Sequence, residues 1–305
     1  MDKNGRTNLF LGWAAVLMLA ASVLFTACPN ANATKTPESP TPKPKYTPVA
    51  YDKLAEYLAN TASATDVNYI EVTGLQAKHL KGDDSNERDP KPSPLGAILQ
   101  LHSTKKVALK LGGSISALMD MPFCFYNCTS LVGVAAIPKG VKDMTDCFDS
   151  CKSLTQAPVL PESVMKMNGC FRDCTSLTQA PVIPEGVENM QSCFSSCKSL
   201  TQAPAIPEGV KDMSYCFRNC TTLTKAPASI PASVQNMSQC FENCTSLTEA
   251  PASIPASVQN MSQCFKKCTS LTQGPAISEG VKDMKGCFRD CISLTEVPAI
   301  PASVT

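Results

Sequence analysis

Met167-Asn-Gly-Cys-Phe-Arg-Asp-Cys-Thr-Ser-Leu-Thr-Gln-Ala-Pro-Val-Ile-Pro-Glu-Gly-Val-Glu-Asn-Met190 is one of eight closely similar stretches that follow one another along this 305-residue chain. Each stretch contains the motif Cys-Phe-x-x-Cys, and successive motifs begin 23 or 24 residues apart. A fixed period in this range is the sequence signature of a solenoid, because one short coil cannot bury its apolar side chains without a neighbour. The repeats therefore decide the fold.

The apolar residues of these stretches recur at fixed places, which indicates a side that faces inward. Each motif contains the same phenylalanine, a leucine follows it six residues later, and in most copies a valine and a methionine precede the next motif. Leu-Thr-x-Ala and the following Ile-Pro alternate as a short strand does. Two prolines per copy, such as Pro181 and Pro184, lack an N–H and limit this strand to about two to four residues. The Cys-Phe-x-x-Cys motif is predicted to form one helical turn, and pairs such as Lys142-Asp143 are predicted to be turn residues.

The repeated frame resembles the BspA-like leucine-rich repeat of bacterial surface proteins over roughly Met121 to Thr305. Two features depart from that family: a cysteine replaces the alanine ahead of the phenylalanine, and an extra step such as Ala180-Pro181 precedes Ile-Pro. The resemblance implies an exported protein of a kind often implicated in adhesion, but it does not imply a particular ligand. The predicted fold is an α/β solenoid, a curved leucine-rich-repeat array of short parallel strands and single helical turns over residues 114–305.

An α/β N-terminal cap is expected ahead of the array, over residues 50–113. Apolar spacing predicts a helix over Tyr51–Asn60, a strand over Val67–Val72, a short helix around Leu95–Leu101 and a strand around Val107–Leu111. Such a cap would cover the apolar end of the first coil and its unpaired backbone groups.

The chain begins with features of a lipoprotein. Residues 1–27 have a polar start and an apolar core, Leu9 to Phe25, which suits a signal peptide better than a membrane span. The sequence ending at Cys28 resembles a bacterial lipobox of the looser spirochaetal form, in which Cys28 becomes lipid-modified. An ordinary signal peptide followed by an unmodified cysteine is the alternative. Residues 28–49 are rich in proline and predict an extended tether. The protein is therefore expected to be exported and lipid-anchored to the bacterial outer membrane or cell surface.

The sixteen cysteines of the array fall in pairs four residues apart. In a helical turn their Cα atoms would lie about 6 Å apart, and the equivalent cysteine one coil away would lie about as near, so both pairings fit disulfide geometry. Intra-repeat disulfides, buried free thiols and inter-coil disulfides all remain open. The candidates are Cys124, Cys128, Cys147, Cys151, Cys170, Cys174, Cys193, Cys197, Cys216, Cys220, Cys240, Cys244, Cys264, Cys268, Cys287 and Cys291.

The strand positions offer the best candidate for contact with a partner, because ladders of Thr and Gln can hydrogen-bond an extended molecule. No aromatic or arginine cluster falls among these positions, which argues against strong binding by a single module. That Thr suits strands and Gln is merely soluble is the competing interpretation. The candidate residues are Thr155, Gln156, Thr178, Gln179, Thr201, Gln202, Thr224, Lys225, Thr248, Glu249, Thr272 and Gln273.

The sequence contains no recognisable catalytic constellation, and a binding protein is therefore expected rather than an enzyme. Lys+Arg 27 against Asp+Glu 26 gives no reason to expect a nucleic-acid partner. The two histidines, His79 and His102, both precede the array, so the motif supplies no Cys-His pair, and no metal, cofactor or catalytic residue is expected. We expect a cell-surface lipoprotein whose solenoid mediates protein–protein interaction or adhesion to host or neighbouring-cell macromolecules. A structural or spacer lipoprotein that faces the periplasm and has no specific ligand is the alternative.

Overall fold

The computed structural model describes residues 44–83, 90–296 and 298–305. The chain divides into two units, Met1–Lys43 and Pro44–Thr305, and the described residues all belong to the second. The predicted signal peptide, the lipidation of Cys28 and most of the predicted tether lie outside the described residues.

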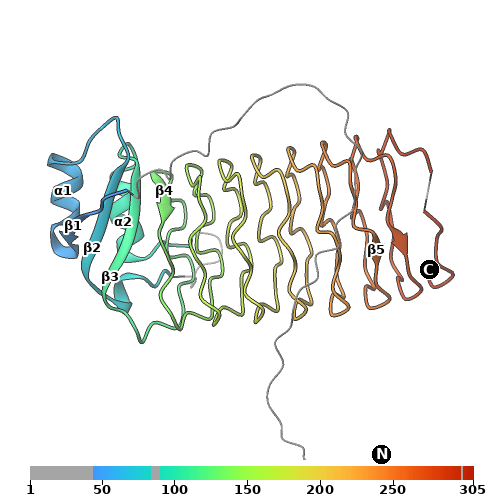
Figure 1. The fold of residues 1–305 in the computed structure, drawn as a ribbon, viewed down its shortest axis with the longest axis horizontal. Coiled ribbons are helices and arrows are strands. Elements are labelled where there is room, and N and C mark those ends of the chain that lie inside the picture. Colours follow the sequence, from blue (N-terminus) through green and yellow to red (C-terminus); the bar gives the residue numbers. More distant parts are fainter. Residues whose placement is uncertain (1–43, 84–89, 297) are drawn as a thin grey trace, which may run out of the picture. The chain divides into compact units, whose positions relative to one another are not determined.

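An α/β segment precedes the repeats and contains the predicted succession of helix, strand, helix and strand. A further strand, Thr47–Ala50, comes first, so the prediction that the tether reaches residue 49 was wrong: these residues pair in parallel with Ile70–Thr73. The strands form one parallel sheet in the order β1-β2-β3-β4, and the last strand belongs to the first repeat, so the sheet runs into the array (Figure 1). The elements are β1 (Thr47–Ala50), the 3-10 helix η1 (Tyr51–Lys53), α1 (Leu54–Asn60), β2 (Asn68–Gln76), the 3-10 helix η2 (Ala77–His79), α2 (Pro94–Leu101), β3 (Val107–Ser114) and β4 (Leu131–Val134).

Helix α2 attaches this segment to the first coil. Ser93 caps the helix by accepting a hydrogen bond from the Gly96 N–H at 3.1 Å, and its hydroxyl donates to the Cys124 carbonyl at 2.8 Å. Pro94 occupies the first helical turn, where a missing N–H has no cost. A Cβ on Gly96 would lie 2.4 Å from the Cys124 carbonyl oxygen, so this close approach requires glycine.

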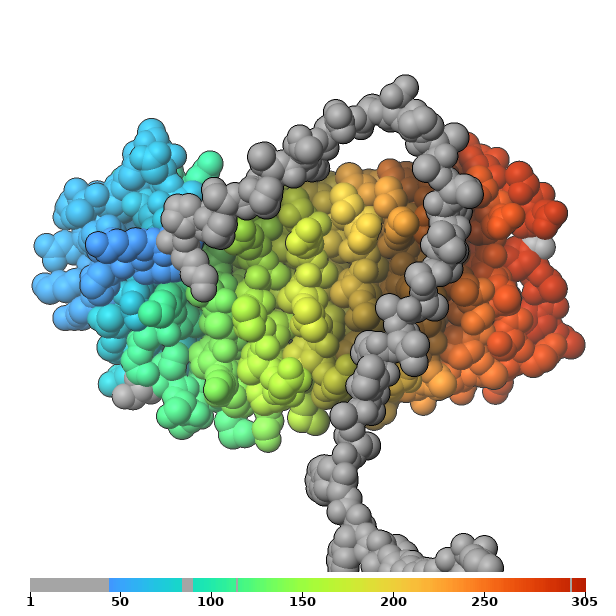
Figure 2. Space-filling model, in the orientation of Figure 1, coloured from blue at the N-terminus to red at the C-terminus, as the bar shows by residue number. Residues whose placement is uncertain are grey.

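The coils stack into one continuous solenoid from the α/β segment to the C-terminus (Figure 2). Strands in the array are as short as predicted: β4 has four residues, and β5 (Ser253–Ile254) and β6 (Ala276–Ile277) have two each. In several other coils the same region makes single parallel bridges, as between Gln202 and Lys225. The fold class predicted from the repeat period, a leucine-rich-repeat solenoid of short parallel strands, is confirmed.

A second parallel ladder lies at the residue before each inward methionine, where the sequence predicted only turns. The side chain there is usually Asp or Asn, and it accepts a hydrogen bond from the backbone N–H two residues later, as Asn189 Oδ1 does from Gln191 at 2.8 Å. The position is therefore both a turn and a contact between coils. The ladder joins Asp120, Asp143, Lys166, Asn189, Asp212, Asn236, Asn260 and Asp283.

The Cys-Phe-x-x-Cys segment consists of consecutive tight turns, and this differs from the single helical turn that was predicted. The residue ahead of each cysteine has a positive φ, as Asp146 (+49°) and Ser150 (+61°) do. The N–H groups of Cys147 and Cys151 donate to carbonyls three residues back, whereas that of Phe148 donates at 2.8 Å to the next coil. An α-helix would direct these N–H groups along its own axis, whereas here alternate N–H groups donate to the next coil and so link the two coils.

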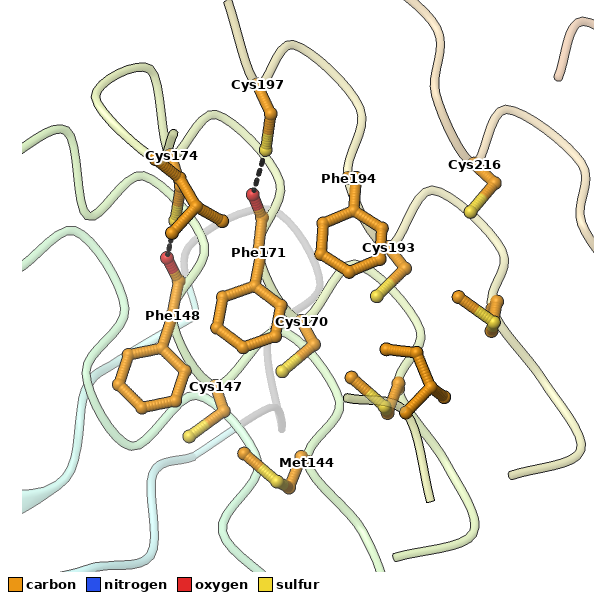
Figure 3. Packing of buried hydrophobic residues seen from close by; sticks show 14 of the residues in the cluster. Met144, Cys147, Phe148, Cys170, Phe171, Cys174, Cys193, Phe194, Cys197 and Cys216 are labelled. Carbon is orange, nitrogen blue, oxygen red and sulfur yellow. Dashed lines mark hydrogen bonds between the residues drawn. The ribbon is translucent and has the colours of Figure 1, made fainter. Parts of the chain in front are cut away.

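The core consists of columns of identical side chains that run along the solenoid. The phenylalanine rings from Phe125 to Phe288 stack nearly parallel, with neighbouring centroids 5.2–5.7 Å apart. Figure 3 shows three of these rings beside the column of first cysteines. Leucine, valine and methionine form parallel columns that are buried along nearly the whole array. This confirms the inward side predicted from the recurring apolar residues.

The sixteen array cysteines are free thiols, and this differs from the disulfide pairings inferred as possible from their spacing. From Cys151 onward the second cysteine of each motif donates its S–H to a backbone carbonyl of the preceding coil, as Cys174 does to Phe148 at 3.1 Å (Figure 3). The first cysteine lies in a separate column within the core. Because the two sulfurs of one motif point to different places, they do not meet. Burial raises the pKa of most of these thiols well above its usual value, as at Cys193.

Candidate functional site: the strand face

The Thr and Gln positions singled out in the sequence all lie exposed on one side of the solenoid, which we call the strand face. It comprises these positions together with the outward side of the sheet β1-β2-β3-β4. The members from the array are Thr155, Gln156, Thr178, Gln179, Thr201, Gln202, Thr224, Lys225, Thr248, Glu249, Thr272 and Gln273.

Several of the threonines use their hydroxyl hydrogen within the solenoid. Thr224 Oγ1 donates to the Thr201 carbonyl at 3.0 Å, and Thr248 Oγ1 donates to the Thr224 carbonyl at 3.2 Å. Such a hydroxyl keeps its lone pairs as acceptors and no longer offers its hydrogen to a partner. These threonines therefore help to join coils, a role that the sequence did not indicate.

The column of residues that follow the threonines changes from neutral to charged side chains along the array. It presents neutral amides at Gln156, Gln179 and Gln202, and then a charged pair in which Lys225 Nζ lies 3.2 Å from Glu249 Oε1. Exposed ion pairs of this kind contribute little to stability, and each charge already has a partner. The neutral end of the column, next to the α/β segment, is therefore the better candidate for contact with a ligand.

Register along the sheet places an aromatic residue at the head of this column. Tyr69 of β2 pairs with Ala108 of β3, Ala108 pairs with Gly133 of β4, and Gly133 pairs with Gln156. Tyr69 is 38% exposed, and its ring makes an edge-to-face contact with that of Tyr46 at 5.6 Å. Tyr46 and Tyr69 precede the repeats and join the face through the sheet, whereas the repeat positions themselves hold no aromatic residue.

A groove of about 670 Å³ lies between Tyr69 and Gln156. Its floor is low because the two residues between them in the column, Ala108 and Gly133, are small. Lys106 is the charged member of the lining; the other polar side chains include Ser153 and Gln156. A second, smaller depression of about 360 Å³ lies further along the face and includes Gln179 and Gln202 in its lining.

Exposed valines flank the groove. Val159 is 69% exposed and lines it, and Val182, at the equivalent place one coil further on, is 90% exposed. From the next coil onward this place is occupied by alanine, as at Ala205. Larger apolar side chains are therefore concentrated at the end of the strand face that carries Tyr69.

The variable positions inside the motifs form ion pairs between coils instead of a second binding surface. Arg172 pairs with Asp149 of the preceding coil, and Glu242 lies 2.9 Å from Arg218 Nε and 2.7 Å from Lys266 Nζ. Burial opposes ionisation of Glu242, but hydrogen bonds and charge from Lys266 and Arg218 lower its pKa overall. These charges are neutralised by their neighbours.

The ionised carboxylate of Asp146 is stabilised less by its neighbours than that of Glu242. Arg172 Nη2 lies 3.2 Å from its Oδ1, but this buried oxygen accepts no hydrogen bond. Burial raises the pKa of Asp146 to about 6, Arg172 opposes that rise, and nearby Asp149 and Asp143 add to it. Ionisation of Asp146 therefore lowers the stability of the folded protein.

The described residues show neither a metal centre nor a spanning helix. Within residues 44–83, 90–296 and 298–305 no three His, Cys, Asp or Glu side chains are grouped so as to hold a metal ion. The described helices are all too short or too polar to traverse a lipid bilayer.

Comparisons with known proteins agree with the repeat architecture. A family model for the BspA type leucine rich repeat region matches six copies over residues 121–224 and 193–305, more than half of the chain. We found no match among curated proteins. The remaining comparisons are with solved structures.

Three solved structures illustrate the similarity. A leucine-rich repeat protein of T. pallidum is 26% identical, with 65% of this chain and 90% of that chain covered and a TM-score of 0.49. A leucine-rich cell surface protein from Faecalibacterium prausnitzii is 21% identical, with 65% and 67% covered and a TM-score of 0.34. An internalin from Listeria monocytogenes is 12% identical, with 82% and 74% covered and a TM-score of 0.33.

Proposed function

The chain belongs to the BspA-type leucine-rich repeat family, and from this we propose that it is an exported lipoprotein that adheres to host or neighbouring-cell macromolecules through its strand face. The observation that carries the proposal is the exposure of three large side chains, Tyr69, Val159 and Val182, in the part of that face nearest the α/β segment. Exposed apolar and aromatic side chains of this kind are the usual anchors of a binding surface. Cys28 is the proposed lipid attachment site, and residues 28–43 are the proposed tether, because the folded unit begins at Pro44.

The first test concerns location. We expect Cys28→Ser to move the protein from the membrane fraction to the soluble fraction, since a lipid chain is then absent. Protease added to intact cells should degrade the wild-type protein and spare a periplasmic marker. Full protection of the wild-type protein on intact cells would refute surface exposure and favour the periplasmic alternative.

The second test concerns the binding face. Immobilised extracellular-matrix preparations are incubated with wild-type protein and with a Val159→Asp, Val182→Asp double variant. Placing two carboxylates at these exposed positions should weaken binding by about tenfold or more, because desolvating each charge opposes contact. The matched control is Ala252→Asp, Ala276→Asp, which adds the same charges to the same column in later coils.

A spacer role without a ligand has some support in the later coils. There, hydroxyls of Thr224 and Thr248 donate to backbone carbonyls, and Lys225 and Glu249 pair with each other. If the wild-type protein binds no matrix preparation, or both double variants bind as well as wild type, this second candidate is favoured and adhesion through the exposed valines is refuted.

A further inference from the structure

We propose that the groove between Tyr69 and Gln156 is a carbohydrate site that takes an extended, neutral oligosaccharide. The inference deepens the proposed function, on which it rests, by naming the class of ligand. The groove volume of about 670 Å³ falls within the range of small-molecule sites, which is about 300–1,000 Å³.

The chemistry of the lining fits a neutral polyhydroxylated ligand better than a charged one. The amide of Gln156 and the hydroxyl of Ser153 line the groove on one side, and Thr155 Oγ1 offers acceptor lone pairs there because its hydrogen is donated to the Val132 carbonyl at 3.3 Å. Lys106 is the charged lining residue. Neutral donors and acceptors match sugar hydroxyls, which can both donate and accept. A polyanionic ligand would need several cations here, and the lining has one.

The aromatic and small residues fit the apolar faces of a sugar ring. Tyr69 presents an exposed ring beside a floor formed by Ala108 and Gly133, and Tyr46 holds that ring through its edge-to-face contact. A pyranose ring has an apolar face of C–H groups that can lie on an aromatic ring, while its hydroxyls at the rim reach Gln156. The remaining apolar lining, which includes Val132 and Val159, supports the same C–H surface.

The same chemistry continues along the strand face. The second depression is lined by Thr178, Gln179, Thr201 and Gln202, which are again uncharged hydroxyl and amide side chains. Neighbouring strands lie about 4.8 Å apart, roughly the length of one sugar residue in an extended chain. A linear oligosaccharide that lies along the solenoid would therefore meet an amide in successive coils.

Gly133 provides a way to close the groove without disturbing the fold. The nearest atom to a Cβ built at Gly133 is the Gln156 carbonyl oxygen at 4.0 Å, so a side chain there meets open space. Valine also suits a strand. Gly133→Val should therefore fill the groove and leave the melting temperature close to that of wild type. Ala205→Val adds the same kind of side chain outside the groove and is the matched control.

Isothermal titration calorimetry of the full mature chain with cellohexaose, chitohexaose and a heparin hexasaccharide tests the proposal. We expect a neutral hexasaccharide to bind and heparin not to bind. Tyr69→Ala and Gly133→Val should each weaken that binding by about tenfold or more, and Tyr69→Phe and Ala205→Val by less than about twofold. Absence of binding by both neutral probes, or equal binding by Gly133→Val, would overturn the proposal.

Enzymatic deglycosylation separates this inference from the proposed function. If removal of glycans from a bound matrix preparation abolishes adhesion, the carbohydrate site is supported. If adhesion survives deglycosylation and is still lost in the Val159→Asp, Val182→Asp variant, the partner is protein. The proposed function then stands and the carbohydrate inference fails.

Discussion

Removing one ring from the phenylalanine column tests whether stacking of identical coils holds the solenoid together. Phe194 is fully buried and its ring lies 5.6 Å from that of Phe171 and 5.7 Å from that of Phe217. Phe→Ala in a well-packed core costs about 3–5 kcal/mol, and we expect Phe194→Ala to fall in this range. The ring of Phe288 has one described ring neighbour, Phe265 at 5.5 Å, and is only half-buried.

The different surroundings of Phe194 and Phe288 predict how much the losses of unfolding free energy should differ. One ring pair contributes about 0.5–1.5 kcal/mol beyond its buried area, and part of the Phe288 ring remains in water. We therefore expect Phe288→Ala to lower the free energy of unfolding by about 1–3 kcal/mol, less than Phe194→Ala.

Urea unfolding followed by far-ultraviolet circular dichroism under reducing conditions measures both losses, and hydrogen exchange locates them. Exchange should accelerate most in the coils on either side of the substituted ring, because each coil contacts only its neighbours. Phe194→Leu, which keeps much of the volume, serves as the mild control. Equal losses of less than about 1 kcal/mol at Phe194 and Phe288 would show that the column does not carry the stability assigned to it.

Three further predictions concern single positions. Lys267 is exposed with a φ of +61°, so Lys267→Gly should raise the free energy of unfolding by about 0.5–1 kcal/mol and Lys267→Val should lower it, as measured by urea unfolding. The raised pKa of Asp146 means that its contribution to stability is fully present below its ordinary value of 3.8 and is lost as the pH rises through about 6. Asp146→Asn should therefore stabilise the protein at pH 7.5, by at most about 3 kcal/mol, and lose that advantage towards pH 4; an equal effect at both pH values would contradict this. Iodoacetamide should label Cys291 before the other array cysteines, because its thiol is half-buried and theirs are buried, and intact mass after unfolding without reductant should show all sixteen labelled if no disulfide forms.

The repeat architecture could be predicted from the sequence because the same residues occupy the same environment in every coil. A period of 23 or 24 residues with the same Phe, Leu, Val and Met leaves only stacking as a way to bury those side chains. The strand lengths followed from the prolines. The turn geometry did not follow, because positive φ values at Asp146 or Ser150 depend on bonds to the next coil, and the residue types there vary from copy to copy.

The candidate site was predictable only in part. The Thr and Gln positions were located because their spacing repeats, but Tyr69 precedes the repeats and its place in the column depends on strand register through Ala108 and Gly133. The alternation of Tyr69 with the inward Ile70 was the available signal. The state of the cysteines could not be predicted from the sequence, because a four-residue spacing fits disulfides and free thiols alike. The directions of the two sulfurs depend on the geometry of the folded turn.

The alternating backbone bonds of the turn region make each contact between coils nearly interchangeable with the next. Residues 226–241 and 250–265 are identical in sequence, and each is followed by a coil that accepts equivalent bonds. Loss or gain of a whole coil by unequal recombination in this region would therefore shorten or lengthen the protein without creating a mismatched joint. Tyr69 and Gln156 both precede that region. Variants of this protein that differ in coil number would therefore keep the same groove and differ in the length of the solenoid beyond it.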